Sequence, residues 1–332
     1  MIDLDFEDIE KVAALPYQWD KLNNKSILIS GGTGFIGSFI AEVIRYRNKK
    51  FGANTKIISL SRRGGKSDST VEYLKADITK PISCDGSVDY ILHLASNTHP
   101  KQYGVDPVGT ITTNVIGCDN LLKLAVDKKA TFLLASSVEI YGQGTEEPMD
   151  EHYCGYIDCN IARSGYNEAK RTCEALCQSY KQQYGIGVKI VRFARVFGAD
   201  KKQDTKAMSQ FMEKAVAGED IVLRSKGNQR FSYCYIADAV SGLLKILLEG
   251  VNGEAYNIAD EDDGLTLGGY AEFMASLAGK KVVYQIEDDA AASRALFALL
   301  DCRKIKDIGW KPMFTVKEGL ERTYKIKCKV CG

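Results

Sequence analysis

Residues 26–37 read Ser26-Ile-Leu-Ile-Ser30-Gly31-Gly-Thr33-Gly34-Phe35-Ile36-Gly37. The apolar run before the first glycine is typical of a buried strand, and residues 35–46 have the pattern of a helix. Glycines between a strand and a helix allow a tight turn and let a pyrophosphate approach the helix N-terminus, whose dipole favours anions. The stretch predicts a dinucleotide site formed by Gly31, Thr33, Gly34, Phe35, Ile36 and Gly37.

The alternation of strands and helices continues along the chain. Further strands are predicted at 56–60, 90–94, 131–135 and 188–192, with helices at 110–126 and 166–184. Repeated β-α-β units predict an α/β fold, a Rossmann-type doubly wound parallel sheet with helices on both faces. After Gly198 the pattern becomes irregular, with few clear strands, as expected of a smaller lobe.

This pattern predicts three parts of the chain. An amphipathic N-terminal extension containing Trp19 covers residues 1–24. The dinucleotide-binding Rossmann domain covers 25–198 plus about 232–258, a boundary set by the element pattern. A smaller C-terminal α/β lobe at 199–231 and 259–332 is expected to bind the substrate.

Composition excludes several classes of protein. The 332 residues carry 44 basic and 43 acidic side chains, so no global field attracts nucleic acid or anionic lipid. No apolar run reaches the length of a membrane span, so we expect no membrane partner. The acidic N-terminus and ten cysteines predict reduced thiols and a cytoplasmic location. Scattered histidines (His93, His99 and His152) and a single pair, Cys328 and Cys331, predict no metal site.

Tyr166 and Lys170 stand four residues apart on a predicted helix, which puts a phenol and an ammonium on one face. Ser137 lies near the end of a predicted strand. A phenol is a poor base at neutral pH until a positive charge stabilises the phenolate, and Lys170 supplies that charge. Each residue alone has a structural interpretation, as a helix pair or a strand-end cap. Together with the glycine turn they predict oxidation of a hydroxyl group on a sugar.

The choice of cofactor depends on Ser61, Arg62 and Arg63, where an acidic residue commonly holds the adenosine ribose of NAD. The two arginines could accept the 2′-phosphate of NADP, or they could be surface charges. NAD is the predicted cofactor and NADP the alternative. The remaining predicted cofactor contacts lie in two segments: Asp77 with Ile78, near the adenine, and Leu94, Ala95 and Ser96, near the ribose and phosphates.

These motifs resemble the extended short-chain dehydrogenase/reductase family, also called the NAD-dependent epimerase/dehydratase family, over roughly residues 25–260. The resemblance includes the glycine turn, Asp77, His93-Leu-Ala95, Asn114, Ser137 and the Tyr166/Lys170 pair. Within the family, Leu94-Ala-Ser96, Tyr103, Tyr166-Asn-Glu-Ala-Lys170 and Glu151-His-Tyr-Cys-Gly155 look most like UDP-glucuronate decarboxylases.

The resemblance implies a nucleotide-diphosphate sugar as substrate. Tyr166 takes the proton of the sugar 4-hydroxyl, Ser137 shares that hydrogen bond, and Lys170 lowers the tyrosine pKa and, with Asn114, contacts the cofactor. Oxidation at C4 turns a C5 carboxylate into a β-keto acid that loses carbon dioxide, after which water or Glu139 supplies a proton. Val138 replaces the aspartate of 4,6-dehydratases and disfavours that reaction. A 4-epimerase and a non-catalytic dinucleotide sensor are the alternatives.

Two positions depart from the family pattern. Arg230, the candidate cation for a uronate carboxylate, stands five residues before Tyr235, where the family has four. Either a bulge restores the register or Phe231 takes the arginine's place and the substrate has no carboxylate. Arg195 stands where related enzymes use an asparagine on the sugar diphosphate. The substrate residues implied are Ser96, Tyr103, Ser137, Glu139, Arg195 and Arg230.

The resemblance also implies a homodimer, built as a four-helix bundle from helices 110–126 and 166–184 of each subunit. Leu121, Leu122, Leu176 and Tyr180 are the candidate interface residues. Their apolar character fits burial in the subunit core equally well.

Overall fold

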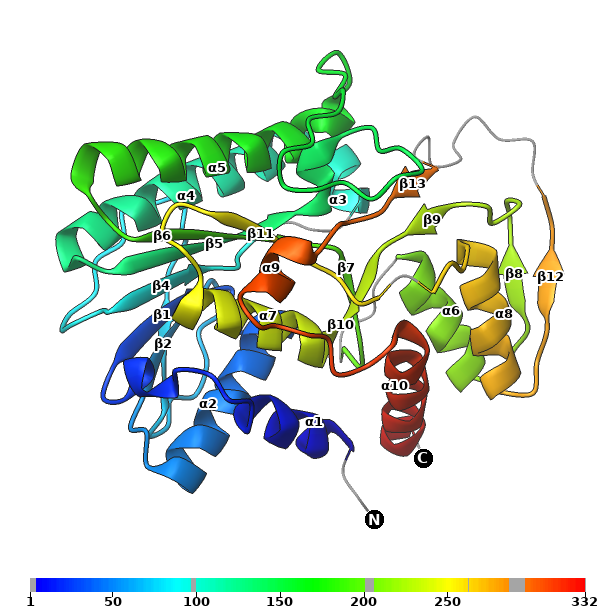
Figure 1. Ribbon diagram of the computed structural model, residues 1–332, viewed down its shortest axis with the longest axis horizontal. Coiled ribbons are helices and arrows are strands. Elements are labelled where there is room, and N and C mark those ends of the chain that lie inside the picture. Colours follow the sequence, from blue (N-terminus) through cyan, green and yellow to red (C-terminus); the bar gives the residue numbers. More distant parts are fainter. Residues whose placement is uncertain (1–3, 97–99, 201–205, 262, 287–295, 332) are drawn as a thin grey trace.

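The computed structural model describes residues 4–96, 100–200, 206–261, 263–286 and 296–331 (Figure 1). Its centre is a seven-stranded sheet in which every neighbouring pair is parallel, in the order β11-β6-β5-β4-β1-β2-β3. The strands are β1 (Ser26–Ser30), β2 (Lys56–Ser61), β3 (Val71–Lys75), β4 (Tyr90–His93), β5 (Thr131–Ser137), β6 (Val188–Phe193) and β11 (Ala255–Ile258). The chain changes direction across the sheet between β1 and β4, the point where ligands bind in such folds. The predicted Rossmann-type sheet is confirmed.

Helices cover both faces of the sheet. Figure 1 shows α4 (Pro107–Lys128) and α5 (Gly165–Tyr184) on one face, with α1 (Leu4–Ala13), α2 (Phe35–Phe51) and α7 (Ile236–Glu249) on the other. The predicted helix at 110–126 begins three residues earlier, since the Asp106 side chain accepts a hydrogen bond from the Gly109 N–H and Pro107 occupies the first turn. The sheet thus has a separate apolar core on each side.

The predicted N-terminal extension is packed into the fold. Helix α1 and the short helix η1 (Trp19–Leu22) lie against the rest of the chain. The Asp8 carboxylate is fully buried, pairs with Arg322 of α10 (Val316–Cys331) at 2.6 Å and accepts a hydrogen bond from the Tyr235 hydroxyl at 2.7 Å. A buried, paired carboxylate fixes the position of α1 against α10.

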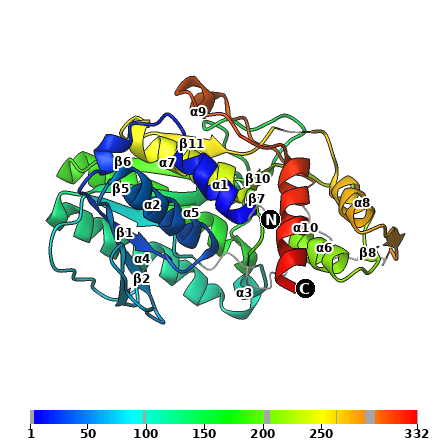
Figure 2. The same ribbon diagram turned by 90° about the horizontal axis from the view of Figure 1, so that it is seen from below.

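The smaller lobe projects from one end of the sheet (Figure 2). It contains α6 (Ala207–Val216), α8 (Leu267–Leu277) and the parallel pair β8 (Ile221–Leu223) with β12 (Val282–Tyr284). Further short pairs are β7 (Arg195–Phe197) with β10 (Tyr233–Tyr235), and β9 (Arg230–Phe231) with β13 (Phe297–Ala298). Strands of two or three residues leave too little alternation to read, which explains why the sequence after Gly198 shows few clear strands. The division into domains stays a prediction.

The remaining short helices are α3 (Pro100–Val105), α9 (Arg303–Asp307), η2 (Val138–Tyr141) and η3 (Ala162–Ser164). Within the described ranges, no helix has both the length and the apolarity required to cross a bilayer. The cysteines whose side chains are described are free thiols, whereas the side chain of Cys331 lies outside the described part. Among the described residues no three His, Cys, Asp or Glu side chains are grouped to hold a metal ion, and His99 lies outside them.

Candidate active site

The glycine turn between β1 and α2 leaves no room for side chains. Gly31 has a φ of 75°, and a Cβ there would lie 2.9 Å from the backbone nitrogen of Ala95. A Cβ at Gly37 would lie 2.6 Å from the carbonyl oxygen of Gly31. Gly34 caps α2 without a side-chain hydrogen bond, so the first-turn amides are left for another acceptor. The turn is a cradle that fits a pyrophosphate.

Ser96 and Asn114, both predicted to contact the cofactor, are joined in the structure. The Ser96 hydroxyl donates to the Asn114 side-chain oxygen at 2.9 Å, and the buried Asn114 amide donates to the Thr110 carbonyl at 2.8 Å. Leu94 and Ala95 connect β4 to Ser96, and the Ala95 N–H donates to Ser30 Oγ at 3.2 Å. These contacts fix the segment after β4 beside the glycine turn.

At the other side of the turn, Ser61 ends β2 while Arg62 and Arg63 are exposed. Asp77 is also exposed, and hydrogen bonds from the Thr79 amide and hydroxyl, with a smaller contribution from the charge of Arg62, lower its pKa. Ile78 is buried, in contrast. The exposed position of Arg62 fits both alternatives, contact with the 2′-phosphate of NADP and a plain surface charge.

His93 lies fully buried beneath this segment. Its Nδ1 is 2.8 Å from Ser30 Oγ, so it links the ends of β1 and β4. Burial, helped by the positive charge of Lys170, lowers the pKa of His93 to about 3. The ring is therefore neutral and structural at neutral pH.

Ser137, Tyr166 and Lys170 lie near the carboxyl end of β5. Ser137 ends β5, and the other two lie in the first two turns of α5 with only 4% and 2% of their surfaces exposed. Lys170 Nζ donates to the Ala135 carbonyl at 2.8 Å and lies 5.9 Å from the centroid of the Tyr166 ring. No carboxylate of the described residues pairs with Lys170. The Lys170 ammonium therefore lies beside the Tyr166 ring with no counter-ion among the described residues.

Tyr103 covers the catalytic tyrosine candidate. The two rings stack with their centroids 4.8 Å apart and an angle of 17° between planes. The guanidinium carbon of Arg163 lies 4.7 Å from the centroid of the Tyr103 ring. The predicted substrate residue Tyr103 is thus held between Tyr166 and a cation.

Glu139 has two partners that sequence reasoning missed. Its carboxylate accepts hydrogen bonds from Arg163 Nη2 at 3.0 Å and from Asn167 Nδ2 at 3.1 Å. Asn167 Nδ2 also donates to the Glu139 carbonyl at 2.7 Å. The sequence contains one signal for these partners of Glu139: Arg163 and Asn167 stand four residues apart and flank Tyr166. Glu139 is thereby fixed beside the triad.

Two arginines hold helix α5 against its surroundings. Arg171 donates to the carbonyls of Ile140 and Gly155 at 2.7 and 2.8 Å. Arg192 on β6 donates to both oxygens of Glu174 at 3.1 and 2.6 Å, with both side chains 12% exposed. The position of α5 relative to Ser137 therefore depends on contacts from two other segments.

Arg195 and Arg230, the two arginines predicted to bind the substrate, lie on different strands and have different neighbours. Arg195 lies on β7, where its guanidinium carbon is 3.7 Å from the centroid of the Phe231 ring. Arg230 lies on β9 and its N–H donates to the Leu296 carbonyl at 2.8 Å. Successive strand residues point to opposite faces, so Arg230 and Phe231 leave β9 on opposite sides. Phe231 is the residue that meets Arg195.

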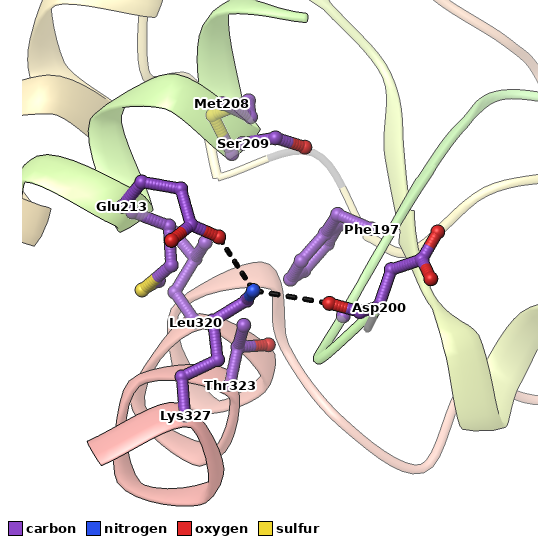
Figure 3. Close-up of a pocket in the computed structure, with 10 residues that line it drawn as sticks. Phe197, Asp200, Met208, Ser209, Glu213, Leu320, Thr323 and Lys327 are labelled. Carbon is purple, nitrogen blue, oxygen red and sulfur yellow. Dashed lines mark hydrogen bonds and ion pairs between the residues drawn. The ribbon is translucent and has the colours of Figure 1, made fainter. Parts of the chain in front are cut away.

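A separate pocket lies between α6 and α10 (Figure 3). Lys327 donates to the Glu213 carboxylate at 2.6 Å and to the Asp200 carbonyl at 3.1 Å within it. None of the predicted cofactor or substrate residues lines this pocket, and its lysine charge is already paired.

The candidate interface residues have different environments. Leu121 and Leu122 are completely buried in the core between α4, α5 and the sheet, so their assignment to a subunit interface is wrong. Leu176 and Tyr180 are partly buried, and the Tyr180 hydroxyl donates to Asp119 at 2.6 Å.

The parallel sheet, the glycine turn and the Tyr166/Lys170 pair define the class as the extended short-chain dehydrogenases/reductases. Residues 27–259 match the NAD dependent epimerase/dehydratase family, and the chain belongs to this family.

Individual relatives agree with this assignment. UDP-glucuronic acid decarboxylase 5 of Arabidopsis thaliana is 34% identical, covering 93% of this chain and 92% of the relative. The fold is similar to Thermotoga maritima UDP-glucose 4-epimerase with UDP-glucose (TM-score 0.78, 23% identity, 92% and 100% of the two chains). It is also similar to a Bacillus cereus UDP-glucuronic acid 4-epimerase mutant in complex with NAD and a fluorinated UDP-glucuronic acid (TM-score 0.77, 19% identity, 92% and 99%).

Proposed function

We propose that this protein oxidises the C4 hydroxyl of a nucleotide-diphosphate sugar with bound NAD(P)⁺ and that its net reaction is decarboxylation of UDP-glucuronate. The observation that carries the proposal is the buried ammonium of Lys170, which has no carboxylate partner among the described residues and lies beside Tyr166. Such a charge lowers the cost of forming a phenolate. Neighbouring Ser137 can donate to or accept from the same sugar hydroxyl.

In this proposal the chain's own groups position the substrate and move protons. Tyr166 accepts the proton of the 4-hydroxyl and returns it at the end of the cycle, while Lys170 stabilises its anion. NAD(P)⁺, when bound, would supply the acceptor for the C4 hydride and, in its reduced form, the donor that returns it. Loss of carbon dioxide from C5 leaves an enolate, and C5 then takes up one proton that comes from solvent, either through a water next to Glu139 or through Glu139 itself once that carboxylate has taken a proton from solvent. The Glu139 contacts with Arg163 and Asn167 hold that carboxylate in place.

The glycine cradle, Ser96 and Asn114 would hold the cofactor. NAD is favoured because the related Bacillus cereus structure is a complex with NAD. Arg62 and Arg63 leave NADP as the alternative, since exposed guanidinium groups at the end of β2 can accept a 2′-phosphate. Mass analysis of the cofactor extracted from the purified protein separates the two.

Decarboxylation is favoured over dehydration because buried Val138 has no proton to give, and the relatives with matching length are named UDP-glucuronic acid decarboxylases. A 4-epimerase is the second candidate. The observation in its favour is Phe231, which meets Arg195 in place of the family's carboxylate-binding arginine.

Product mass tests the proposal. The protein is incubated separately with UDP-glucuronate, UDP-glucose and UDP-galactose in the presence of NAD⁺. We expect UDP-glucuronate to lose carbon dioxide and the two hexose substrates to stay unchanged. Interconversion of UDP-glucose and UDP-galactose without loss of carbon dioxide from UDP-glucuronate would instead establish the epimerase.

We also propose a homodimer formed through α4 and α5, in a cytoplasmic enzyme. The support is the set of exposed apolar side chains on α4: Val108 (70%), Ile111 (42%) and Ile116 (41%). Light scattering on the purified protein gives the subunit number. A monomer at micromolar concentration would exclude this interface.

A further inference from the structure

Arg195 lies at the same sheet edge as the triad. It follows β6 by two residues, and Phe193 at the end of β6 is the register partner of Ser137 in β5. The Arg195 N–H donates to the Ser232 carbonyl at 3.3 Å, which ties β7 to the segment joining β9 and β10. Because the carboxyl ends of parallel strands meet at one edge, Arg195 is placed where a substrate of Ser137 would extend.

The guanidinium of Arg195 is fixed but its charge is not neutralised. Its carbon lies 3.7 Å from the centroid of Phe231, a ring that is only 9% exposed. Its Nη1 is buried without a hydrogen-bond partner, and no carboxylate in the described ranges forms an ion pair with it. A buried cationic donor without an acceptor is unfavourable, and stacking on a ring compensates only in part.

This arrangement fits a receptor for an anion. A guanidinium whose central carbon lies over a ring can keep its N–H groups at its edge, where they match the two oxygens of a phosphate or carboxylate. The ring also restricts rotation of the side chain, so less conformational freedom is lost on binding. Arg230, on the opposite side of β9, does not share this ring.

We propose that Arg195, stacked on Phe231, is the cation that binds an oxyanion of the nucleotide sugar, and that this charge has moved from β9 to β7. The chain thus replaces the family's asparagine on β7 by arginine and the family's arginine on β9 by phenylalanine, as a coupled pair. The inference rests on the proposed substrate class, and the oxyanion is either the diphosphate or a uronate carboxylate.

Calorimetric titration of the NAD⁺-loaded protein with UDP, UDP-glucose and UDP-glucuronate tests the pair. Arg195→Gln is expected to weaken binding by about tenfold or more, because a charge-assisted hydrogen bond is lost. Equal weakening for all three probes assigns the diphosphate, and weakening for UDP-glucuronate alone assigns the carboxylate. Arg303→Gln, which removes a guanidinium that is 82% exposed, is the matched control and is expected to bind like the wild type.

Two further variants keep the test decisive. Arg195→Lys is expected to recover part of the affinity because it restores the charge without the planar group. The exchange Arg195→Asn with Phe231→Arg, which returns the cation to β9, is expected to bind better than Arg195→Asn alone. Each variant's thermal midpoint is measured with the titration, so a folding defect is seen separately.

The two proposals fail in different ways. Wild-type affinity of Arg195→Gln for all three probes, or no gain from the exchange, overturns the coupled pair and leaves the proposed function standing. Failure of the wild-type protein to bind any probe overturns the substrate class itself. Weakened binding by Arg195→Gln in a protein that releases no carbon dioxide would refute decarboxylation but support the anion receptor.

Discussion

Replacing Arg192 with methionine removes an ion pair that joins helix α5 to strand β6. Arg192 donates two hydrogen bonds to Glu174, one to the Tyr141 hydroxyl at 3.0 Å and one to the Glu151 carbonyl at 2.7 Å. Methionine fills much of the same space without the charge. The substitution leaves the Glu174 carboxylate, only 12% exposed, without its partner.

The expected cost is large because the pair is buried. Breaking a buried ion pair by removing one partner typically costs about 3–5 kcal/mol, a large part of a total stability of about 5–15 kcal/mol. The Tyr141 hydroxyl keeps its hydrogen bond to Asn257 at 2.6 Å, so it adds little to the loss. The double variant Arg192→Met, Glu174→Leu removes both charges and is expected to recover most of the loss.

Urea unfolding followed by circular dichroism measures these differences. Arg303→Met is the control, since Arg303 also makes two contacts to one carboxylate, Asp301, but is 82% exposed. Asp301 is itself only 14% exposed, but it keeps the hydrogen bond from the Arg303 backbone N–H at 2.9 Å, so the substitution is expected to cost less than about 1 kcal/mol. If Arg192→Met costs no more than Arg303→Met, the buried pair does not stabilise the fold as reasoned. A double variant as unstable as the single one would show that packing, rather than the unpaired carboxylate, causes the loss.

Three other outcomes are expected. Tyr166→Phe lowers kcat by about 10²–10⁴ and leaves the cofactor affinity nearly unchanged, because only the proton acceptor is lost; near wild-type turnover would exclude Tyr166 as the base. Gly37→Ala weakens NAD⁺ binding by about tenfold or more in a titration, because the Cβ of the alanine would lie 2.6 Å from the Gly31 carbonyl oxygen and would force the glycine turn to shift. Unchanged affinity would mean that the turn adapts without strain. His93 has a folded pKa of about 3 against an ordinary 6.5, so the unfolded chain binds one more proton between these values. The free energy of unfolding therefore falls by about 1.4 kcal/mol per pH unit as the pH drops below that ordinary value. Urea unfolding of the wild type and of His93→Asn between about pH 7 and pH 5 measures this dependence, and the variant is expected to lose it. If both proteins lose stability equally with falling pH, a group other than His93 causes the dependence.

The strands and helices around the glycine turn could be predicted because local pattern decides them. Strand β1 is predicted with the bounds that the structure has, and α5 begins one residue earlier than predicted. Strand β3 was missed because two of its five residues, Glu72 and Lys75, are charged and only Val71 is buried, as is usual for a strand at a sheet edge. Helix α7 was also missed, although its polar residues Asp238, Ser241, Lys245 and Glu249 recur at helical spacing on one face, which is the signal that could have found it.

The sequence by itself determined the α/β fold, the glycine cradle and the Tyr166/Lys170 pair, because each depends on spacing within one strand, turn or helix. Only the tertiary structure decided the partners of Glu139 and the stacking of Arg195 on Phe231. These contacts join residues far apart in the chain, and their geometry depends on how the strands and loops pack together. Local periodicity holds no information on contacts between segments that are far apart in the chain. These contacts are therefore known only from the folded structure.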